Sequence, residues 1–404
     1  MSSLARIISV KDIGQAEKEM LGIGAGTVGI SIMAPKAVFR AVKLSAVNVT
    51  AANIIKQDML SSGGEAVTSY GTIDHSEKAT DMLLLGTLAQ YKKLFYKLKI
   101  QQFGLPSLAE QIEKAIDVVS SVPAPILSME FGKKTSVMGI LNVTPDSFSD
   151  GGRFLSAGSA VKRAFEMLDE GADILDIGGE STRSGAEEIN FQEEIERVIP
   201  VIEDIRRSRG QANRHFLISV DTRKSRVAEA ALKAGADMVN DVSGLCFDPK
   251  MPEILAVYGV PVIIMHSKGD PKTMQNAPRY DDLIYEMMLF FEERMNAACK
   301  AGIKETNIVI DPGIGFGKTL DHNIEIIRRL EEFRCFGRPV CIGASRKSFI
   351  GKILSVEDPS LRDVGTASTI SIAISKKVDI IRVHNVGMAR QTAVISDTIL
   401  REGA

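Results

Sequence analysis

Polar side chains that could bind or activate a small molecule recur at eight places in the second part of the chain, each at or just after the carboxyl end of a short apolar run. The runs are 137–143, 174–179, 216–220, 238–239, 261–265, 307–310, 339–344 and 379–383. Their polar residues are Asn142, Glu180, Thr182, Arg183, Asp221, Asn240, Asp241, His266, Asp311, Ser345, Arg346, Lys347, Arg382 and His384. Carboxylates and carboxamides can hydrogen-bond a bound ligand, and arginine, lysine and histidine can place positive charge beside it. These residue types predict a small-molecule site that combines both abilities.

Strands and helices in strict alternation must position these side chains. Helical patterns lie between and after the runs, at 157–171, 191–209, 224–235, 249–258, 279–302, 321–333, 361–377 and 387–402. The carboxyl ends of all strands in a closed parallel barrel lie on one face, so residues scattered over about 240 positions would share one pocket. We therefore expect an α/β protein built around a TIM (β/α)8 barrel. A doubly wound open sheet is the alternative, but it would concentrate its ligand at one switch point.

The length of 404 residues leaves room for a second domain beside a barrel of about 250 residues. We expect a smaller N-terminal α/β domain of unknown role at 1–125, a linker at 126–134 and the barrel at 135–404. In the first domain, the apolar segments 28–33 and 83–85 are expected to be strands. Thr50 is expected to cap a helix that ends near Gly63.

The composition indicates a small-molecule enzyme of the cytoplasm. A net charge of -2 gives no bulk attraction to nucleic acid or to anionic membranes, and the lysines near 92–99 fit a solvated helix face. The four cysteines show neither metal-ligand spacing nor the density of a secreted disulfide framework. We expect neither a signal peptide nor a membrane-spanning segment.

Several motifs are excluded as functional sites. The glycine-rich segment 313–319 is not a P-loop, because position 312 is proline, and it fails the dinucleotide-binding pattern because position 318 is lysine. His75, His215 and His322 lack the spacing of metal ligands, so we expect surface or packing roles for them. The glycine-rich segment is instead expected to let its backbone approach a ligand closely.

Five motifs resemble the signatures of the dihydropteroate synthase family. They are MGILNVTPDSFSDGG at 138–152, DIGGESTR at 176–183, DPGIGFGK at 311–318, SRK at 345–347 and RVH at 382–384. The resemblance covers roughly 135–400. It implies a TIM barrel of folate biosynthesis that condenses (7,8-dihydropterin-6-yl)methyl diphosphate with 4-aminobenzoate, giving 7,8-dihydropteroate and diphosphate.

The resemblance also implies a set of site residues. The pterin-binding residues would be Asp221, Asn240, Met265, Asp311, Gly315 and Lys347. The diphosphate-binding residues would be Asn142, Arg183, Arg382 and His384, and Asn142 would also bind Mg2+. The aminobenzoate-binding residues would be Pro145, Thr182, Phe316 and Ser348. The catalytic residues would be Asp146, Asp221, Lys347 and Arg382.

The implied mechanism is dissociative. Diphosphate leaves first, carboxylates such as Asp146 and Asp221 stabilise the cationic pterin methylene, and the neutral arylamine then attacks it. Such chemistry needs no strong base, which agrees with the absence of a Ser-His-Asp pattern. Residues 144–148 would cover the site, and sulfonamides would compete with 4-aminobenzoate. Family members also imply a homodimer formed through outer barrel helices.

Three points depart from this scheme or compete with it. Ser184 follows Thr182 and Arg183 where many relatives have proline, which predicts a more flexible second loop. Two other kinds of protein remain as alternatives. One is a pterin-dependent methyltransferase, whose reaction expels no diphosphate, and the other is a non-catalytic pterin-binding or scaffold protein. A modified pterin or another arylamine would fit the same motifs.

Overall fold

The computed structural model describes residues 3–143, 153–180, 188–212, 214–269, 274 and 277–401, and the chain divides into two compact units, Met1–Ser121 and Val122–Ala404. In the second unit eight parallel strands follow the order β10-β11-β4-β5-β6-β7-β8-β9. The strands are β4 (Ser136–Asn142), β5 (Ile174–Gly178), β6 (Leu217–Asp221), β7 (Met238–Asp241), β8 (Val262–Met265), β9 (Ile308–Asp311), β10 (Cys341–Ile342) and β11 (Ile380–Val383). A parallel bridge between Ile310 and Val340 joins the two ends of this order. The expected TIM barrel is thus confirmed.

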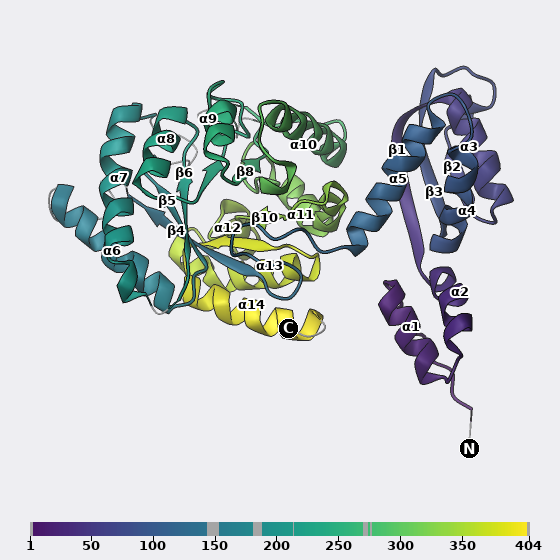
Figure 1. Ribbon diagram of the computed structural model, residues 1–404, viewed down its shortest axis with the longest axis horizontal. Helices are drawn as coiled ribbons and strands as arrows, with labels where there is room; N and C mark the ends of the chain where they lie inside the picture. The colour runs from purple at the N-terminus through teal and green to yellow at the C-terminus, as the bar shows by residue number, and fades with distance from the viewer. Residues whose placement is uncertain are drawn as a thin grey trace. The chain divides into compact units, whose positions relative to one another are not determined.

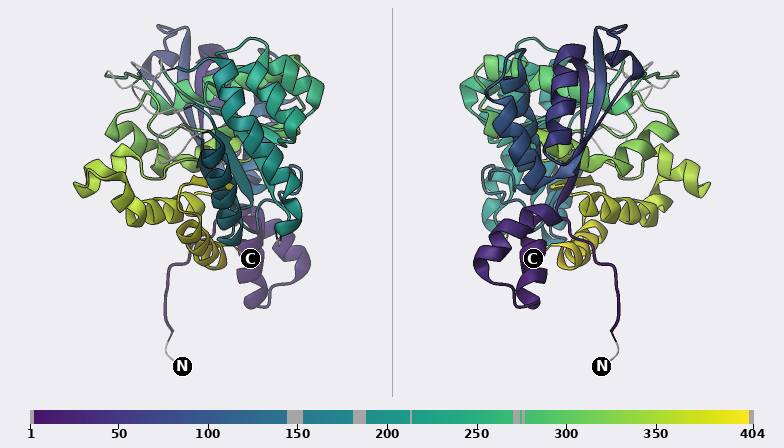
Figure 2. Two further views of the ribbon diagram at one scale, coloured as in Figure 1. Left: turned by 90° about the vertical axis from the view of Figure 1, so that its left-hand side faces the viewer. Right: turned by 90° about the vertical axis from the view of Figure 1, so that its right-hand side faces the viewer.

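Helices surround the barrel strands (Figure 1, Figure 2). They are α6 (Arg153–Asp169), α7 (Phe191–Arg207), α8 (Ser225–Ala234), α9 (Met251–Tyr258), α10 (Leu283–Lys300), α11 (Leu320–Arg328), α12 (Ser348–Leu354), α13 (Asp363–Ser375) and α14 (Val386–Leu400). Helix α12 was not expected, and the segment predicted as one helix at 321–333 is α11 followed by a 3-10 turn, Leu330–Phe336. Most strand residues are fully buried, because helices cover one face and interior side chains fill the other.

Residues 126–131, which precede β4, cover the end of the barrel at which the strands begin. Side chains near the amino ends of the strands, such as Met138 and Ile263, form a buried cluster with Ile126, Met129 and Phe131. Ile126 and Met129 also exchange two backbone hydrogen bonds of 3.1 and 2.9 Å. Burying an apolar side chain of this size stabilises a fold by about 1.5–3 kcal/mol. Residues in the segment predicted as a linker therefore belong to the core of the second unit.

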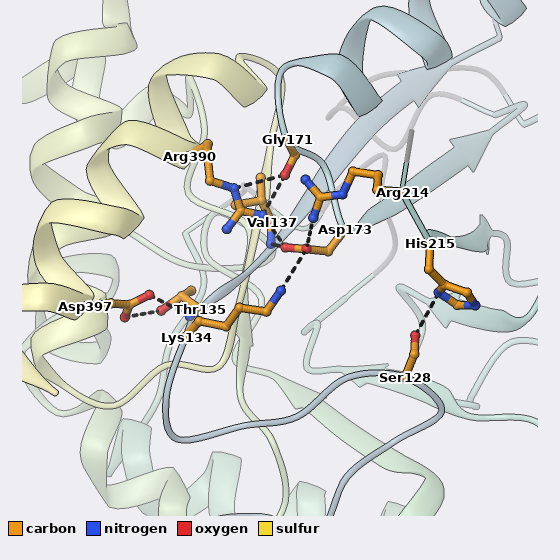
Figure 3. Close-up of polar contacts among 10 residues, drawn as sticks. All are labelled: Ser128, Lys134, Thr135, Val137, Gly171, Asp173, Arg214, His215, Arg390 and Asp397. Carbon is orange, nitrogen blue, oxygen red and sulfur yellow. Dashed lines mark hydrogen bonds and ion pairs between the residues drawn. The ribbon is translucent and has the colours of Figure 1, made fainter. Parts of the chain in front are cut away.

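A polar network ties the first and last parts of the barrel at the same end (Figure 3). The carboxylate of Asp173 accepts hydrogen bonds from Arg390, from Arg214 at 2.5 Å and from the Val137 backbone N–H at 2.9 Å. Beside it, Asp397 accepts from the backbone N–H and the hydroxyl of Thr135, at 2.7 and 2.9 Å. Helix α14 is thereby bonded to the residues that begin β4 and β5.

The first unit is a small α/β fold. An antiparallel sheet has the order β1-β3-β2, and helices α3 and α4 pack on it around one apolar core. Its elements are α1 (Ile13–Gly22), α2 (Thr27–Ala37), β1 (Phe39–Asn48), α3 (Val49–Ser61), β2 (Glu65–Thr68), β3 (Ala79–Thr87), α4 (Leu88–Leu98) and α5 (Leu105–Ser120).

Two expectations for this unit need correction. The segment 28–33, predicted as a strand, lies inside helix α2, whereas 83–85 lies inside β3 as expected. The residue that caps α3 is Asn48 and not Thr50, because the Asn48 side chain accepts the Thr50 backbone N–H at 2.9 Å. Lys92 and Lys93 on α4 are exposed, as expected of a solvated face. Across the described ranges of both units, no helix combines the length and apolarity needed to span a membrane.

We expect Asp173→Ala to lower the free energy of unfolding by about 3 kcal/mol, because it leaves two arginines and a backbone N–H without their acceptor. Urea denaturation monitored by circular dichroism measures this change. Lys134→Ala is the matched control: its ammonium is 3.3 Å from Asp173 but 56% exposed, so its loss should cost less than about 1 kcal/mol. Equal losses in the two variants would contradict the assignment.

Candidate active site

Arg382 joins two buried carboxylates inside the barrel. Its Nε donates to Asp176 Oδ2 and its Nη2 donates to Asp221 Oδ2, both at 2.6 Å. In the strand register, Gly178 pairs with Asp221, and Asp176 lies two residues before Gly178 on β5. The Arg382 guanidinium therefore contacts side chains from two successive layers of the barrel interior. The two bonds use two of the five N–H donors of an arginine. In the part of the chain that the structure describes, the other N–H groups of Arg382 have no hydrogen-bond partner, so a ligand could bond to them.

Asn240 extends this group from β7. Its Nδ2 donates to Asp176 Oδ2 at 3.1 Å, and its side chain is buried. Strand register pairs Asn240 with Asp221 on the neighbouring strand. Three strands thus bring a carboxamide and two carboxylates around one guanidinium.

The second half of the site is the glycine-rich loop after β9. Asp311 Oδ1 accepts the Gly313 backbone N–H at 2.7 Å, while Lys347 donates to the carbonyl of Ile314 and lies 4.4 Å from the centre of the Phe316 ring. Gly315 has a φ of +81°, and a side-chain carbon there would lie 3.2 Å from Lys347 Cδ. Glycine therefore fits both the backbone conformation and the close passage of the lysine.

Lys318 holds this loop from its other side. Its ammonium is buried and contacts three acceptors: His266 Nδ1 at 2.9 Å, the His266 carbonyl at 3.2 Å and the Phe316 carbonyl at 3.0 Å. Three acceptors match the three donors of an ammonium group. Burial lowers the pKa of Lys318 well below its ordinary value, and burial, together with Lys318, lowers the pKa of His266 to about 2. His266 is thus a neutral acceptor that supports the loop.

Burial dominates the electrostatics of the interior. It raises the pKa of Asp221 to about 7, although Arg382 opposes the shift, and it raises the pKa of Asp311, which Lys347 opposes. Burial also lowers the pKa of Lys347 to about 8, against the attraction of Asp311. Groups whose charged forms are this costly interact strongly with a ligand that offers complementary charge or hydrogen bonds.

Further predicted residues lie around these two groups. His384 Nδ1 is 3.0 Å from Ser345 Oγ, which also accepts the His384 backbone N–H. Met265 ends β8 and is buried, and Ser348 is the exposed first residue of α12. Asn142 ends β4 at the level of Gly178. Predicted residues Pro145, Asp146, Thr182 and Arg183 lie outside the described residues, as does Ser184.

Asn142 is the predicted residue that could hold a metal ion. A side-chain carbon at Gly178 would lie 3.7 Å from both Asn142 Oδ1 and Asp221 Oδ2, so the two oxygens border the same space. Within the described ranges, no three His, Cys, Asp or Glu side chains form a metal-binding group. A single hard oxygen donor fits a cation whose other ligands come from substrate and water, which is the usual mode for Mg2+.

Some polar residues at strand ends bond to neighbouring loop or helix residues and not to the groups described above. Glu180 accepts from Lys224 at 2.9 Å, and Asp241 accepts the N–H and hydroxyl of Ser243 at 2.7 and 2.6 Å. Arg346 donates two hydrogen bonds to Asp363, at 2.7 and 2.9 Å. These pairs organise the loops after three strands, whereas Arg382 and Lys347 remain beside the acids of the barrel interior.

Two residues of the site were missed in the sequence. Asp176 appeared only as part of a motif, yet it bonds both Arg382 and Asn240. The available signal was a carboxylate in the middle of an apolar strand, where burial demands a partner. Lys318 appeared only as the last residue of the DPGIGFGK motif and as the residue that breaks the dinucleotide-binding pattern, and its role in supporting the loop had no sequence signal.

The arrangement combines acceptors and donors for a heterocycle with cationic groups for an anion. Asp221, Asn240 and Asp311 supply oxygen acceptors deep in the barrel, and Lys347 and Arg382 supply donors beside them. Electrostatic positioning of this kind suits a reaction that develops positive charge on a ring substituent and negative charge on a leaving group.

Comparison with known proteins agrees with the family resemblance of the sequence motifs. The family model described as pterin binding enzyme matches residues 138–384. Dihydropteroate synthase of Synechocystis sp. is 47% identical over 272 residues, covering 67% of this chain and 92% of that protein. A crystal structure of dihydropteroate synthase from Clostridium difficile in the presence of pteroic acid superposes with a TM-score of 0.63 at 45% identity, covering 67% of this chain and 99% of that chain.

One relative also extends over the first unit. A probable bifunctional folylpolyglutamate synthase/dihydropteroate synthase of Halobacterium salinarum is 40% identical over 358 residues, covering 89% of this chain and 42% of that protein. The second unit, 122–404, has 283 residues, so this alignment must include part of the first unit. Part of the first unit is therefore similar to this relative as well.

We expect Asp221→Asn to be more stable relative to the wild type at pH 8 than at pH 5, because burial raises the pKa of the Asp221 carboxyl in the folded protein. The pKa of Asp221 is about 7 in the folded protein and about 3.9 in an unfolded chain. Between these values the folded state binds more protons, so wild-type stability falls as the pH rises, and the full cost is present above pH 7.

Urea denaturation of both proteins at pH 5 and pH 8 measures this difference. The gain in the variant should be smaller at pH 5, where the folded wild type still carries a protonated Asp221. An equal gain at both pH values would show that burial of the charge is not its cause.

Proposed function

This chain belongs to the dihydropteroate synthase family of pterin-binding enzymes, and we propose that the described barrel interior is the site of its reaction. It condenses (7,8-dihydropterin-6-yl)methyl diphosphate with 4-aminobenzoate to give 7,8-dihydropteroate and diphosphate, a step of folate biosynthesis. The observation that carries the proposal for the site is the placement of Arg382 between Asp176 and Asp221, beside the Asp311 and Lys347 pair.

We propose that the pterin ring lies between these two groups. A pterin presents amino and ring N–H donors on one edge, and Asp221, Asn240 and Asp311 offer buried acceptors for them. Lys347 is available to donate to the pterin carbonyl, and Met265 and Gly315 would border the ring. The raised pKa of Asp221 and of Asp311 supports this role, because a ligand donor would relieve a poorly solvated carboxylate.

We propose that the diphosphate binds at the outer ends of β4 and β11. Arg382 and His384 would contact it from β11 and the loop that follows, together with Asn142 and Arg183. Asn142 would also bind Mg2+ through its carboxamide oxygen. When bound, this ion would neutralise charge on the leaving diphosphate, whose oxygens would supply further ligands.

The aminobenzoate subsite is proposed beside the glycine-rich loop. The Phe316 ring, with Lys347 against its face, and Ser348 at the start of α12 would contact the arylamine, and Pro145 and Thr182 would complete the subsite. The Lys318 bond to the Phe316 carbonyl fixes the backbone that carries this ring. Sulfonamides would compete with 4-aminobenzoate here.

The proposed chemistry proceeds by loss of diphosphate before attack. The C–O bond at the pterin methylene breaks and its electron pair leaves on the diphosphate, beside the cationic Arg382. Asp221, with Asp146 as a second candidate, would stabilise the resulting cation. The arylamine nitrogen then forms the C–N bond and loses a proton. Positioning and electrostatics would supply most of the rate enhancement.

We also propose that the protein is a cytoplasmic homodimer. Helices α13 and α14 pack side by side, and Val364, Ile395 and Ile399 on them are 80%, 62% and 75% exposed. An apolar surface of this kind supports association of two barrels through these helices. The four cysteines are free, which supports a reducing compartment.

We expect Asp311→Ala to abolish pterin binding while preserving the fold. The variant removes a buried acceptor and leaves Lys347 without its nearby carboxylate. Calorimetry with 6-hydroxymethylpterin measures the affinity, and circular dichroism reports the fold. An affinity equal to that of the wild type would refute the proposed pterin site.

Arg382→Ala should lower turnover by at least about a hundredfold, because the departing diphosphate loses its cationic partner. Diphosphate release measured with both substrates gives the rate. Lys376→Ala is the control: this lysine pairs with Glu331 on the outside of the barrel, and its loss should leave turnover unchanged. Wild-type turnover in Arg382→Ala would contradict the role of the arginine.

A further inference from the structure

Asp176 is the most deeply buried member of the polar group in the barrel interior. It is fully buried in the middle of β5, and a single carboxylate oxygen, Oδ2, accepts both from Arg382 Nε at 2.6 Å and from Asn240 Nδ2 at 3.1 Å. Its other oxygen, Oδ1, is also buried and has no hydrogen-bond partner among the described residues. The carboxylate therefore connects two proposed ligand-binding side chains without lying at the ligand surface itself.

The Asp176 carboxylate determines which way the Asn240 carboxamide faces. Asn240 donates through its NH2 group to Asp176 Oδ2, the oxygen that also accepts from Arg382, so the Asn240 Oδ1 is turned away from Asp176. That orientation presents an acceptor to the ligand. A flipped carboxamide would present a donor instead and would fail to bond the N–H edge of a pterin.

The same carboxylate determines the plane of the Arg382 guanidinium. A bond from Nε to Asp176 and a second from Nη2 to Asp221 fix the planar group at two points. The unused N–H donors then point in directions set by these bonds. With Asp221 alone, the guanidinium could rotate about a single contact.

We propose that Asp176 is a positioning residue of the reaction, which orients the Asn240 carboxamide for the pterin and the Arg382 guanidinium for the diphosphate. This inference rests on the proposed function of the barrel interior. Asp176 would not contact the substrate itself, but it would fix which hydrogen-bond donors and acceptors face the substrate. Its effect must therefore pass through Asn240 and Arg382.

A double-mutant cycle tests this dependence. At saturating substrate concentrations, Asp176→Asn should lower kcat at least about thirtyfold, and in an Arg382→Ala background the same change should lower kcat less than about threefold, because the arginine it orients is absent. Asp176→Asn should also weaken binding of 6-hydroxymethylpterin about tenfold, and less than about threefold in an Asn240→Ala background. Equal effects in both backgrounds would overturn the proposal, because they would indicate general structural damage.

Asp379→Asn is the matched control. Asp379 is another buried aspartate paired with an arginine, Arg334 at 2.8 Å, but it lies just before β11 at the amino ends of the strands. This variant removes a carboxylate from a similar pair, so a loss of stability should appear without coupling to Arg382. Coupling as strong as that of Asp176→Asn would count against the proposal.

Arg382→Lys gives a second test that does not require Asp176 to be changed. Lysine keeps the charge, but its compact ammonium cannot bridge the carboxylates as a planar guanidinium does. We expect turnover within about fivefold of Arg382→Ala, since charge without orientation is insufficient. Turnover close to that of the wild type would overturn the proposal. If the wild-type protein itself released no diphosphate, the proposed function would fail instead, independently of these variants.

Discussion

A single arginine shared between two buried carboxylates constrains the whole interior of this barrel. Arg382 contributes one positive charge to a space that also contains Asp176 and Asp221, and burying such charges is costly unless every partner is in place. The two acids come from different strands, and the arginine comes from a third. Strands β11, β5 and β6 lie within four consecutive positions of the strand order, and their interior side chains meet there. Burying these charges lowers the stability of the fold, but it also provides hydrogen-bond donors and acceptors that a charged substrate can use.

The fold was largely predictable because parallel strands covered by helices are apolar throughout and end in polar residues. The strand error at 28–33 has a clear physical origin. Apolar residues alternate there with glycine and serine, which matches the two-residue period of a strand. Packing against neighbouring helices instead selects a helix in which Ile30 and Ala34, four residues apart, are buried. Tertiary contacts therefore outweighed the local pattern.

The candidate site was predictable in its residue types and only partly in its geometry. Asp221 and Asp241 are both acids at strand ends, yet Asp221 bonds Arg382 inside the barrel while Asp241 caps the following turn. Sequence alone does not separate these cases, because the backbone after each strand determines where the side chain points. Asp176 was missed for a different reason: it lies inside a strand and not at its end, although it bonds two residues of the site.

The hydrogen bonds between Thr135 and Asp397 join residues 262 positions apart, and Arg390 reaches back to Asp173 and Gly171 in the same region. A ribosome synthesises the chain from its amino end, so β4 and β5, which begin the ring, are made before α14. Asp176 on β5 likewise has no bonded Arg382 until β11 has been made. Nascent chains that stop short of β11 and α14 would expose an incomplete ring and become substrates of chaperones and proteases.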